Sequence, residues 1–263
     1  MFWFKKKEHV IDCFTTDLYA LEYCKITSAV RHYPEWFKRL PSMVDDNNNL
    51  IPSIQHCHGF KDLYKNSFMI PYWSSIQIKV NTIENPGYRY ESVSMVTIHE
   101  HPLVQISGYL PEQKIGHMKI LSPWLLKSKD LIKFYLSDPT WNSNRLNDYT
   151  ILPGILDFKY QHTLNINILF EYRVKERVVN LEPGMPVVML TPLVNDDITV
   201  KMVCHQITEA EAIKYNHNIR VNPFKLNTQG NFESLYLKKK KFLDRHEENT
   251  RQDRKCPFGF GKK

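Results

Sequence analysis

The sequence GILDFKY at residues 154–160, followed by VNLEPGMPVVML at residues 179–190, decides our expectation for the fold. A glycine turn opens the first stretch, and Asp157 and Tyr160 lie three residues apart within it. The turn at Pro183-Gly184 then precedes a second apolar strand. Short apolar segments of this kind, separated by Gly and Pro turns, predict β-strands.

The same pattern recurs along most of the chain. Ser75–Val80 alternates apolar and polar residues, and the turn at Asn85–Gly87 ends it. Fourteen Tyr and fourteen Phe also favour pleated, half-buried surfaces. Further strands are expected at Val10–Thr15, Tyr88–Ile98, Val104–Tyr109, His117–Leu121, Leu131–Leu136, Thr163–Phe170, Val178–Leu181 and Val187–Leu193. We therefore predict a mainly β protein, with a sandwich or barrel-like domain.

Short helices are expected near the N-terminus. Ile26–Arg39 has a helical pattern that Pro34 interrupts, so that Pro34–Leu40 becomes one short helix, and Gly59–Lys65 is another. The polar run Asp45–Asn49 between them predicts a loop. Residues 1–66 are thus expected to form an N-terminal cap of helices and a strand, and residues 67–204 the β domain.

Residues 205–263 are expected to form a helical, basic C-terminal extension. Thr208 followed by Glu211 is typical of a capping box, and a helix is predicted to run to about Tyr215. A charged helix is predicted from Phe232 to about Glu248. The 26 residues from Lys238 onward hold ten Lys or Arg and four Asp or Glu, which accounts for +6 of the net charge of +7. We expect the run Lys238, Lys239, Lys240 and Lys241 to bind an acidic partner or nucleic acid.

The cysteines and the apolar stretches of the sequence indicate the kind of compartment in which the protein is expected to function. Five cysteines lie far apart without a Cys-x-x-Cys pair, which argues against a disulfide framework and for a reducing environment. The start of the chain has no apolar region of the kind found in secretory signals, and no stretch approaches the ~18–20 apolar residues that a spanning helix needs.

Residues 151–193 resemble the core of the trimeric dUTP pyrophosphatases and dCTP deaminases, where a Gly-x-x-Asp-x-x-Tyr strand precedes a Pro-Gly turn and an apolar strand. The resemblance implies a β-clip fold. It also implies that Asp157 orients the attacking water and that Tyr160 packs under the sugar. A carboxylate can accept the water proton, and an aromatic ring offers a flat wall. Mg²⁺ and a trimer would accompany this activity.

The sequence departs from that family where phosphate chemistry is needed. Where the family has a second acidic residue, this chain has Lys159, and where the family has the following glycine, it has His162. Met189 stands in place of the glutamine of the last strand. The family's phosphate motif contains an arginine, but the equivalent segment of this chain, Tyr135–Pro139, has none. Asp138 in this segment would repel phosphate. These departures favour a protein that keeps the strands and turns of the fold but has lost the phosphate-binding residues, and we expect no cofactor.

The chain as a whole looks similar to uncharacterised proteins of tailed bacteriophages, particularly those of marine bacteria. The residues that carry this resemblance are Pro34–Pro41, Gly59–Asp62, Pro123–Lys127, Pro153–Asp157 and Glu182–Gly184. The resemblance implies a phage origin and a place in the virion or in the cytoplasm of the infected host. It does not imply a reaction.

A metal centre is another interpretation. His99 and His101 would point the same way on a strand, and His117 could complete a cupin-like site. Glu112 lies eleven residues after His101, which is further than a cupin motif places its glutamate.

Three functions therefore remain open. The first is a non-catalytic β-domain protein of a phage, either a virion component or a binding protein, and it is the one we favour. The second is a divergent nucleotide hydrolase or deaminase that uses Asp157. The third is a metal-dependent enzyme that uses His99, His101 and His117.

Overall fold

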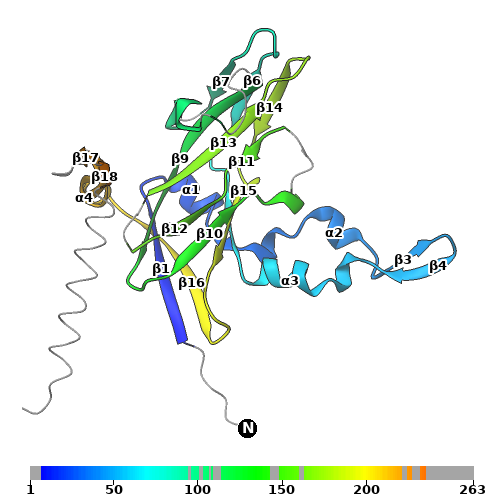
Figure 1. The fold of residues 1–263 in the computed structure, drawn as a ribbon. Helices are drawn as coiled ribbons and strands as arrows, with labels where there is room; N and C mark the ends of the chain where they lie inside the picture. Colours follow the sequence, from blue (N-terminus) through cyan, green and yellow to red (C-terminus); the bar gives the residue numbers. More distant parts are fainter. Residues whose placement is uncertain are drawn as a thin grey trace, which may run out of the picture.

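The computed structural model describes residues 7–93, 96–100, 103–106, 108, 114–142, 148–159, 163–220, 224–226 and 232–234. The described part is mainly β, as the sequence predicts, with strands gathered into a body from which helical segments project (Figure 1).

The largest sheet is built around one long strand. Its strands are β1 (Lys7–Thr15), β8 (Ile98–Glu100), β9 (Ile115–Ser128), β11 (Thr150–Ile151), β13 (Thr163–Glu171) and β16 (Ile198–Gln206). Their order is β11–β13–β9–β1–β16, and β8 also pairs with β9. One edge of β9 pairs with β13, whereas its other edge pairs first with β8 and then with β1. Strand β9 therefore joins segments from both halves of the chain.

Pro123 lies inside β9. Proline lacks the N–H of a ladder hydrogen bond, so it is tolerated in a sheet where the ladder is interrupted. The pairing of β9 with β13 shifts register at this place, between Thr163 and Asn165 of β13. The neighbouring Trp124 is fully buried in the core. The Pro-Trp motif therefore marks a bulge with a core anchor.

Two smaller sheets complete the body. One has the order β12–β10–β15–β5–β2, and the other β14–β6–β7. Their strands are β2 (Thr27–Ser28), β5 (Phe68–Pro71), β6 (Ile76–Val80), β7 (Tyr88–Ser92), β10 (Lys133–Ser137), β12 (Gly154–Asp157), β14 (Arg177–Leu181) and β15 (Pro186–Pro192). In β6, Ile76, Ile78 and Val80 are buried and the residues between them are exposed, which confirms the predicted alternation.

All three sheets contribute to one hydrophobic core. Trp124 of β9, Phe134 of β10 and Val179 of β14 belong to the same cluster of buried residues. Ile11 and Cys13 of β1 also belong to it. The predicted N-terminal segment 1–66 therefore supplies a strand to the body, besides the short helix α1 (Leu18–Tyr23).

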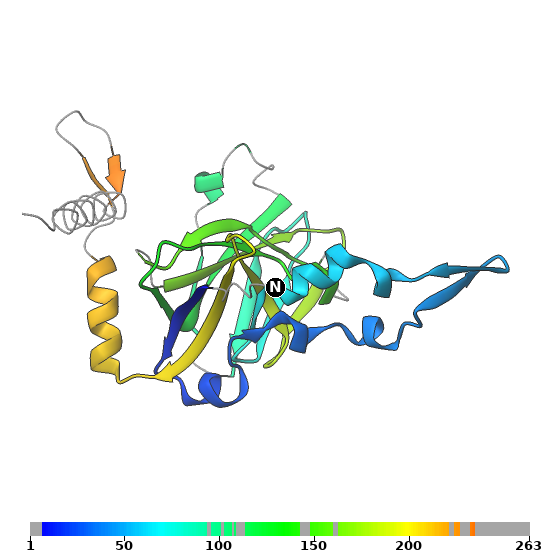
Figure 2. The ribbon, with the colours of Figure 1, turned by 90° about the horizontal axis from the view of Figure 1, so that it is seen from below.

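A helical arm projects from the body (Figures 1 and 2). We define the arm as residues 29–66, and its elements are η1 (Ala29–His32), α2 (Glu35–Arg39), β3 (Met43–Asp46), β4 (Asn49–Pro52), η2 (Ile54–His56) and α3 (His58–Lys65). The helices predicted at Pro34–Leu40 and Gly59–Lys65 are confirmed as α2 and α3. The helix predicted between residues 26 and 33 is wrong, because this part forms β2 and the 3₁₀ turn η1.

Stacked aromatic rings hold the base of the arm. The ring centroids of Tyr33 and Tyr64 lie 4.7 Å apart, and those of Phe37 and Phe60 lie 4.4 Å apart. Trp141, in the 3₁₀ turn η5 (Thr140–Asn142), packs edge-on against Phe60. Such contacts stabilise the base through burial and ring geometry.

The loop predicted at Asp45–Asn49 is the end of the β3–β4 hairpin. Asn47 and Asn48 form its turn with φ of 54° and 64°. Asparagine tolerates this left-handed backbone better than most residues, which suits it to a two-residue hairpin turn.

The structure differs from the sequence prediction in three other places. The strand predicted at Val104–Tyr109 is wrong, because Leu103–Ile106 forms the 3₁₀ turn η3. Strand β16 was not predicted. The helix predicted from Phe232 begins instead as a strand, since β17 (Phe224–Leu226) pairs with β18 (Phe232–Ser234), and the rest of that prediction lies outside the described residues.

The helix predicted after Thr208 is confirmed as α4 (Glu209–Arg220). The Thr208 backbone N–H and hydroxyl each donate to Glu211 Oε2 at 2.9 Å, and the Glu211 N–H donates to Thr208 Oγ1 at 3.3 Å. This reciprocal pattern is a capping box. Helix α4 leaves the body on the side opposite to the arm (Figure 2). Within the described residues, no helix has the length and apolarity to span a membrane.

Candidate functional site

Asp157 lies at the end of β12 and is 5% exposed. Its Oδ1 accepts a hydrogen bond from the Lys159 N–H at 3.1 Å, so the carboxylate closes a turn in its own chain segment. Lys133 of β10 is its neighbour across the strand pair. The predicted catalytic aspartate is therefore buried and takes part in its own turn.

This turn contacts the end of β9. The carbonyl of Phe158 accepts a hydrogen bond from the Ser128 N–H at 3.1 Å. Ser128 is the last residue of β9 and is 4% exposed. The strand end that carries Asp157 is thus joined through Phe158 to the connection between β9 and β10.

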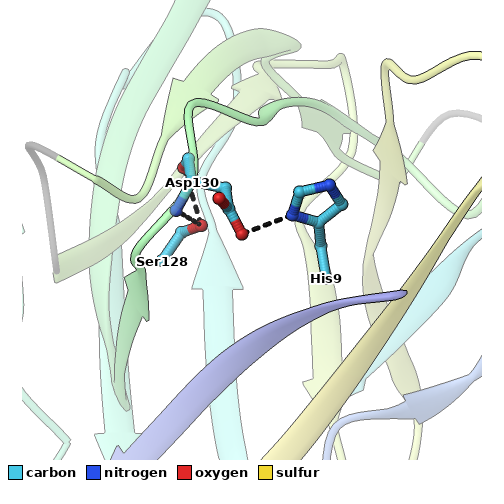
Figure 3. A network of polar contacts seen from close by, with 3 residues as sticks. All are labelled: His9, Ser128 and Asp130. Carbon is cyan, nitrogen blue, oxygen red and sulfur yellow. Dashed lines mark hydrogen bonds and ion pairs between the residues drawn. The ribbon is translucent and has the colours of Figure 1, made fainter. Parts of the chain in front are cut away.

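Ser128 and Asp130 stabilise that connection (Figure 3). The Ser128 hydroxyl donates to the Asp130 carbonyl at 2.7 Å, and the Asp130 N–H donates to the same hydroxyl at 3.1 Å. A serine that bonds to the backbone two residues later is typical of a turn. The serine therefore holds the backbone of Asp130, from which its side chain projects.

The carboxylate of Asp130 contacts His9 of β1. Oδ2 of Asp130 is paired with Nδ1 of His9 (Figure 3). The His9 side chain is 7% exposed and that of Asp130 is 46% exposed. A buried ring nitrogen requires a partner, and a carboxylate is a strong one. We call His9, Ser128 and Asp130, together with the neighbouring Asp157, the buried polar cluster, because His9, Ser128 and Asp157 are buried, while the Asp130 side chain is partly exposed.

The buried polar cluster is not arranged as a Ser-His-Asp triad. A triad needs the serine hydroxyl within reach of the histidine nitrogen that the carboxylate does not contact. Here the Ser128 hydroxyl donates to the Asp130 carbonyl, and Ser128 and His9 lie on opposite sides of the Asp130 carboxylate (Figure 3). The cluster therefore fastens β1 and β12 to the end of β9.

The remaining positions of the predicted nucleotide site lie apart. Tyr160 and His162 lie outside the described residues. Met189 is 2% exposed and packs in the hydrophobic cluster at the base of the arm. Tyr135 is 40% exposed on β10, and Asp138 follows that strand. Burial raises the pKa of Asp138 to about 6. A partly buried carboxyl is a poor neighbour for phosphate.

The predicted metal ligands have different surroundings. His99 is exposed on β8, where it pairs across the strands with Lys119. His117 is 5% exposed on β9. His101 lies outside the described residues, as does Glu112. Among the residues whose positions are described, no three His, Cys, Asp or Glu side chains form a group suited to a metal ion.

The predicted binding residues Lys238, Lys239, Lys240 and Lys241 also lie outside the described residues. His9 and Asp130 were not among the residues predicted to form a site. A signal was present, because His9 precedes Ile11 and Cys13 at alternate positions and therefore shares their core-facing side of the strand.

Comparison with models of known protein families and with curated proteins finds no match for this chain.

Replacing Asp130 by alanine is expected to destabilise the protein by about 1–2 kcal/mol, because the buried Nδ1 of His9 loses its partner. Urea unfolding at neutral pH measures this loss. Asp12→Ala is the matched control, since Asp12 pairs with His205 at 3.0 Å on the other face of β1, with side chains 32% and 40% exposed. The control is expected to cost less than about 1 kcal/mol. If the two variants lost equal free energy of unfolding, the contact of Asp130 with the buried His9 would contribute no more than an exposed ion pair.

Asp138→Asn is expected to stabilise the protein above pH 6, the approximate pKa to which burial raises this carboxyl from its ordinary 3.8. The native state binds this proton more tightly than the unfolded chain does, so the ionised Asp138 destabilises the native state at high pH. This destabilisation disappears as the pH falls below the native pKa and then below the unfolded pKa. Because the group is partly solvated, we expect about 1 kcal/mol at neutral pH and none near pH 4. Urea unfolding over this range measures the difference, and a pH-independent gain would contradict the assignment.

Proposed function

We propose that this protein is a non-catalytic binding or assembly protein encoded by a tailed bacteriophage, and that it acts in the virion or in the cytoplasm of the infected host. The proposal rests on a contrast between its interior and its surface. The buried polar cluster is engaged in fastening strands, whereas the arm presents apolar side chains to solvent.

The β3–β4 hairpin of the arm carries this proposal. Leu50 is 72% exposed, Ile51 is 43% exposed and Met43 is 39% exposed. A two-stranded hairpin is marginally stable by itself in water. Leu50 and Met43 lie on one face of the strand pair and Ile51 on the other, so both faces of the hairpin present apolar side chains, as interaction sites often do. We therefore assign the hairpin to contact with another copy of the chain, as in a multi-subunit assembly.

The stacked rings at the base of the arm suit this role. Gln55 donates from Nε2 to the carbonyls of Phe37 and Leu40, at 3.0 and 2.6 Å, and thereby ties η2 to α2. A hairpin on a rigid base loses less conformational freedom when it binds. The basic C-terminal extension would supply a second contact, to nucleic acid or to an acidic surface.

The purified full chain is expected to release no pyrophosphate from any deoxynucleoside triphosphate, with or without magnesium. The Asp157 carboxylate is buried in its own turn, and the phosphate-motif position carries a carboxyl instead of an arginine. Ion chromatography of the products measures release. Turnover that Asp157→Ala abolishes would overturn the proposal and support the nucleotide-hydrolase alternative, for which Mg²⁺ and a trimer are expected.

Light scattering of the full chain is expected to show a mass that rises with protein concentration, and Leu50→Ser is expected to reduce this association. Burying one leucine side chain contributes about 1.5–3 kcal/mol, or roughly tenfold or more in affinity. Val174→Ser is the matched control, because Val174 is 83% exposed outside the arm. A wild-type chain that stays monomeric, or an equal effect of both variants, would contradict the role of the hairpin.

A further inference from the structure

Two cysteines face each other across the parallel pair of β1 and β16. Cys13 and Cys204 are register partners, in a ladder that runs from Lys7 opposite Ile198 to Thr15 opposite Gln206. Cys13 is fully buried in the core, and Cys204 is partly buried against the same core. The two thiols thus project from the same face of the sheet.

The spacing of these strands suits a disulfide. Neighbouring strands lie about 4.8 Å apart, and disulfides join Cα atoms about 4.4–6.8 Å apart. Neither thiol is engaged in a strong bond, since Cys13 Sγ donates to the Ile11 carbonyl and Cys204 Sγ to the Ile26 carbonyl, each at 3.8 Å. The backbone would therefore need little rearrangement for the sulfur atoms to bond.

The two thiols differ in acidity. The interaction between the two side chains is the largest influence on both pKa values, and it lowers the pKa of Cys204 while raising that of Cys13. Burial raises both pKa values, and the backbone of Ile26 and the charge of Lys25 lower that of Cys204 further. Cys204 is also the more accessible of the two. It is therefore the thiol that forms a thiolate first.

We propose that Cys13 and Cys204 form a redox-active pair that is oxidised to a disulfide by a low-molecular-weight disulfide such as oxidised glutathione. The Cys204 thiolate attacks one sulfur of the oxidant, which forms a mixed disulfide and releases one glutathione thiolate. Cys13 then loses its proton and attacks the Cys204 sulfur, which releases the second. The two cysteines are oxidised, one oxidised glutathione becomes two reduced molecules, and the two protons go to the released thiolates.

The bond would lock the base of the C-terminal extension. Within the described residues, β16 pairs only with β1, and α4 follows it directly. Tyr215 of α4 stacks on Phe14 of β1 with ring centroids 5.2 Å apart, and Lys127 Nζ of β9 lies 5.2 Å from the centroid of the Tyr215 ring. In the reduced protein, noncovalent contacts hold this junction. In the oxidised protein, a covalent bond would hold it as well.

Peptide mapping without reduction tests the pair in the full chain. A background with Cys57→Ser and Cys256→Ser avoids links through the exposed Cys57 and through the C-terminal segment. After treatment with oxidised glutathione, mass spectrometry is expected to find a peptide that joins Cys13 to Cys204. The same link is expected with Cys24→Ala, a change at another buried cysteine, and no link is expected with Cys204→Ser.

Thermal unfolding gives a second readout. The link closes a very long loop, so the oxidised background is expected to unfold at a Tm higher than the reduced one by roughly 5 °C or more. This shift should persist with Cys24→Ala and be absent with Cys204→Ser. The proposal would be overturned if Cys13 and Cys204 both remained free thiols, each open to alkylation, after oxidation of the folded background. A disulfide between Cys24 and Cys204 would overturn it as well. The reversible thermal transition of each variant shows that it was folded when it was oxidised, so that the mapped link reports the β1–β16 pairing.

Discussion

The pairing of β9 along both of its edges is the constraint on which the rest of the structure depends. A strand of fourteen residues spans roughly 46 Å, far more than the usual strand. It pairs with β13 along one edge and with β8 and β1 along the other, so it fixes segments distant in sequence against one core. Its backbone hydrogen bonds have to be satisfied over this whole length, and the register shift near Pro123 accommodates the one residue that cannot donate.

The C-terminal end of β9 also explains the buried polar cluster. Polar groups that leave water need partners inside the protein, and Ser128, Asp130 and His9 provide them for one another where β9, β1 and β12 meet. Asp157 is adjacent because Phe158 bonds to Ser128. The Asp157 carboxylate, which the sequence alone had marked as a catalytic candidate, accepts a hydrogen bond from the Lys159 N–H in its own turn.

The surface carries the features that we assign to function. The arm and α4 leave opposite sides of the body, so a chain can make two contacts at once without the two competing for the same surface (Figures 1 and 2). Aromatic packing stiffens one of these projections, while the β1–β16 pair holds the base of the other. The facing cysteines lie in that pair, which connects the chemistry of the thiols to the attachment of the C-terminal extension.

The sequence by itself determined the local elements, because their causes lie within a few residues. The alternation in Ile76–Val80, the helix after Pro34 and the capping box of Thr208 and Glu211 all depend on short-range geometry. Only the tertiary structure decided that His9 would meet Asp130, 121 residues away, and that Cys13 would face Cys204. It also made Leu103–Ile106 a 3₁₀ turn despite its apolar pattern. The physical reason is that strand partners and register depend on many weak contacts between distant segments, and no short window of sequence contains them.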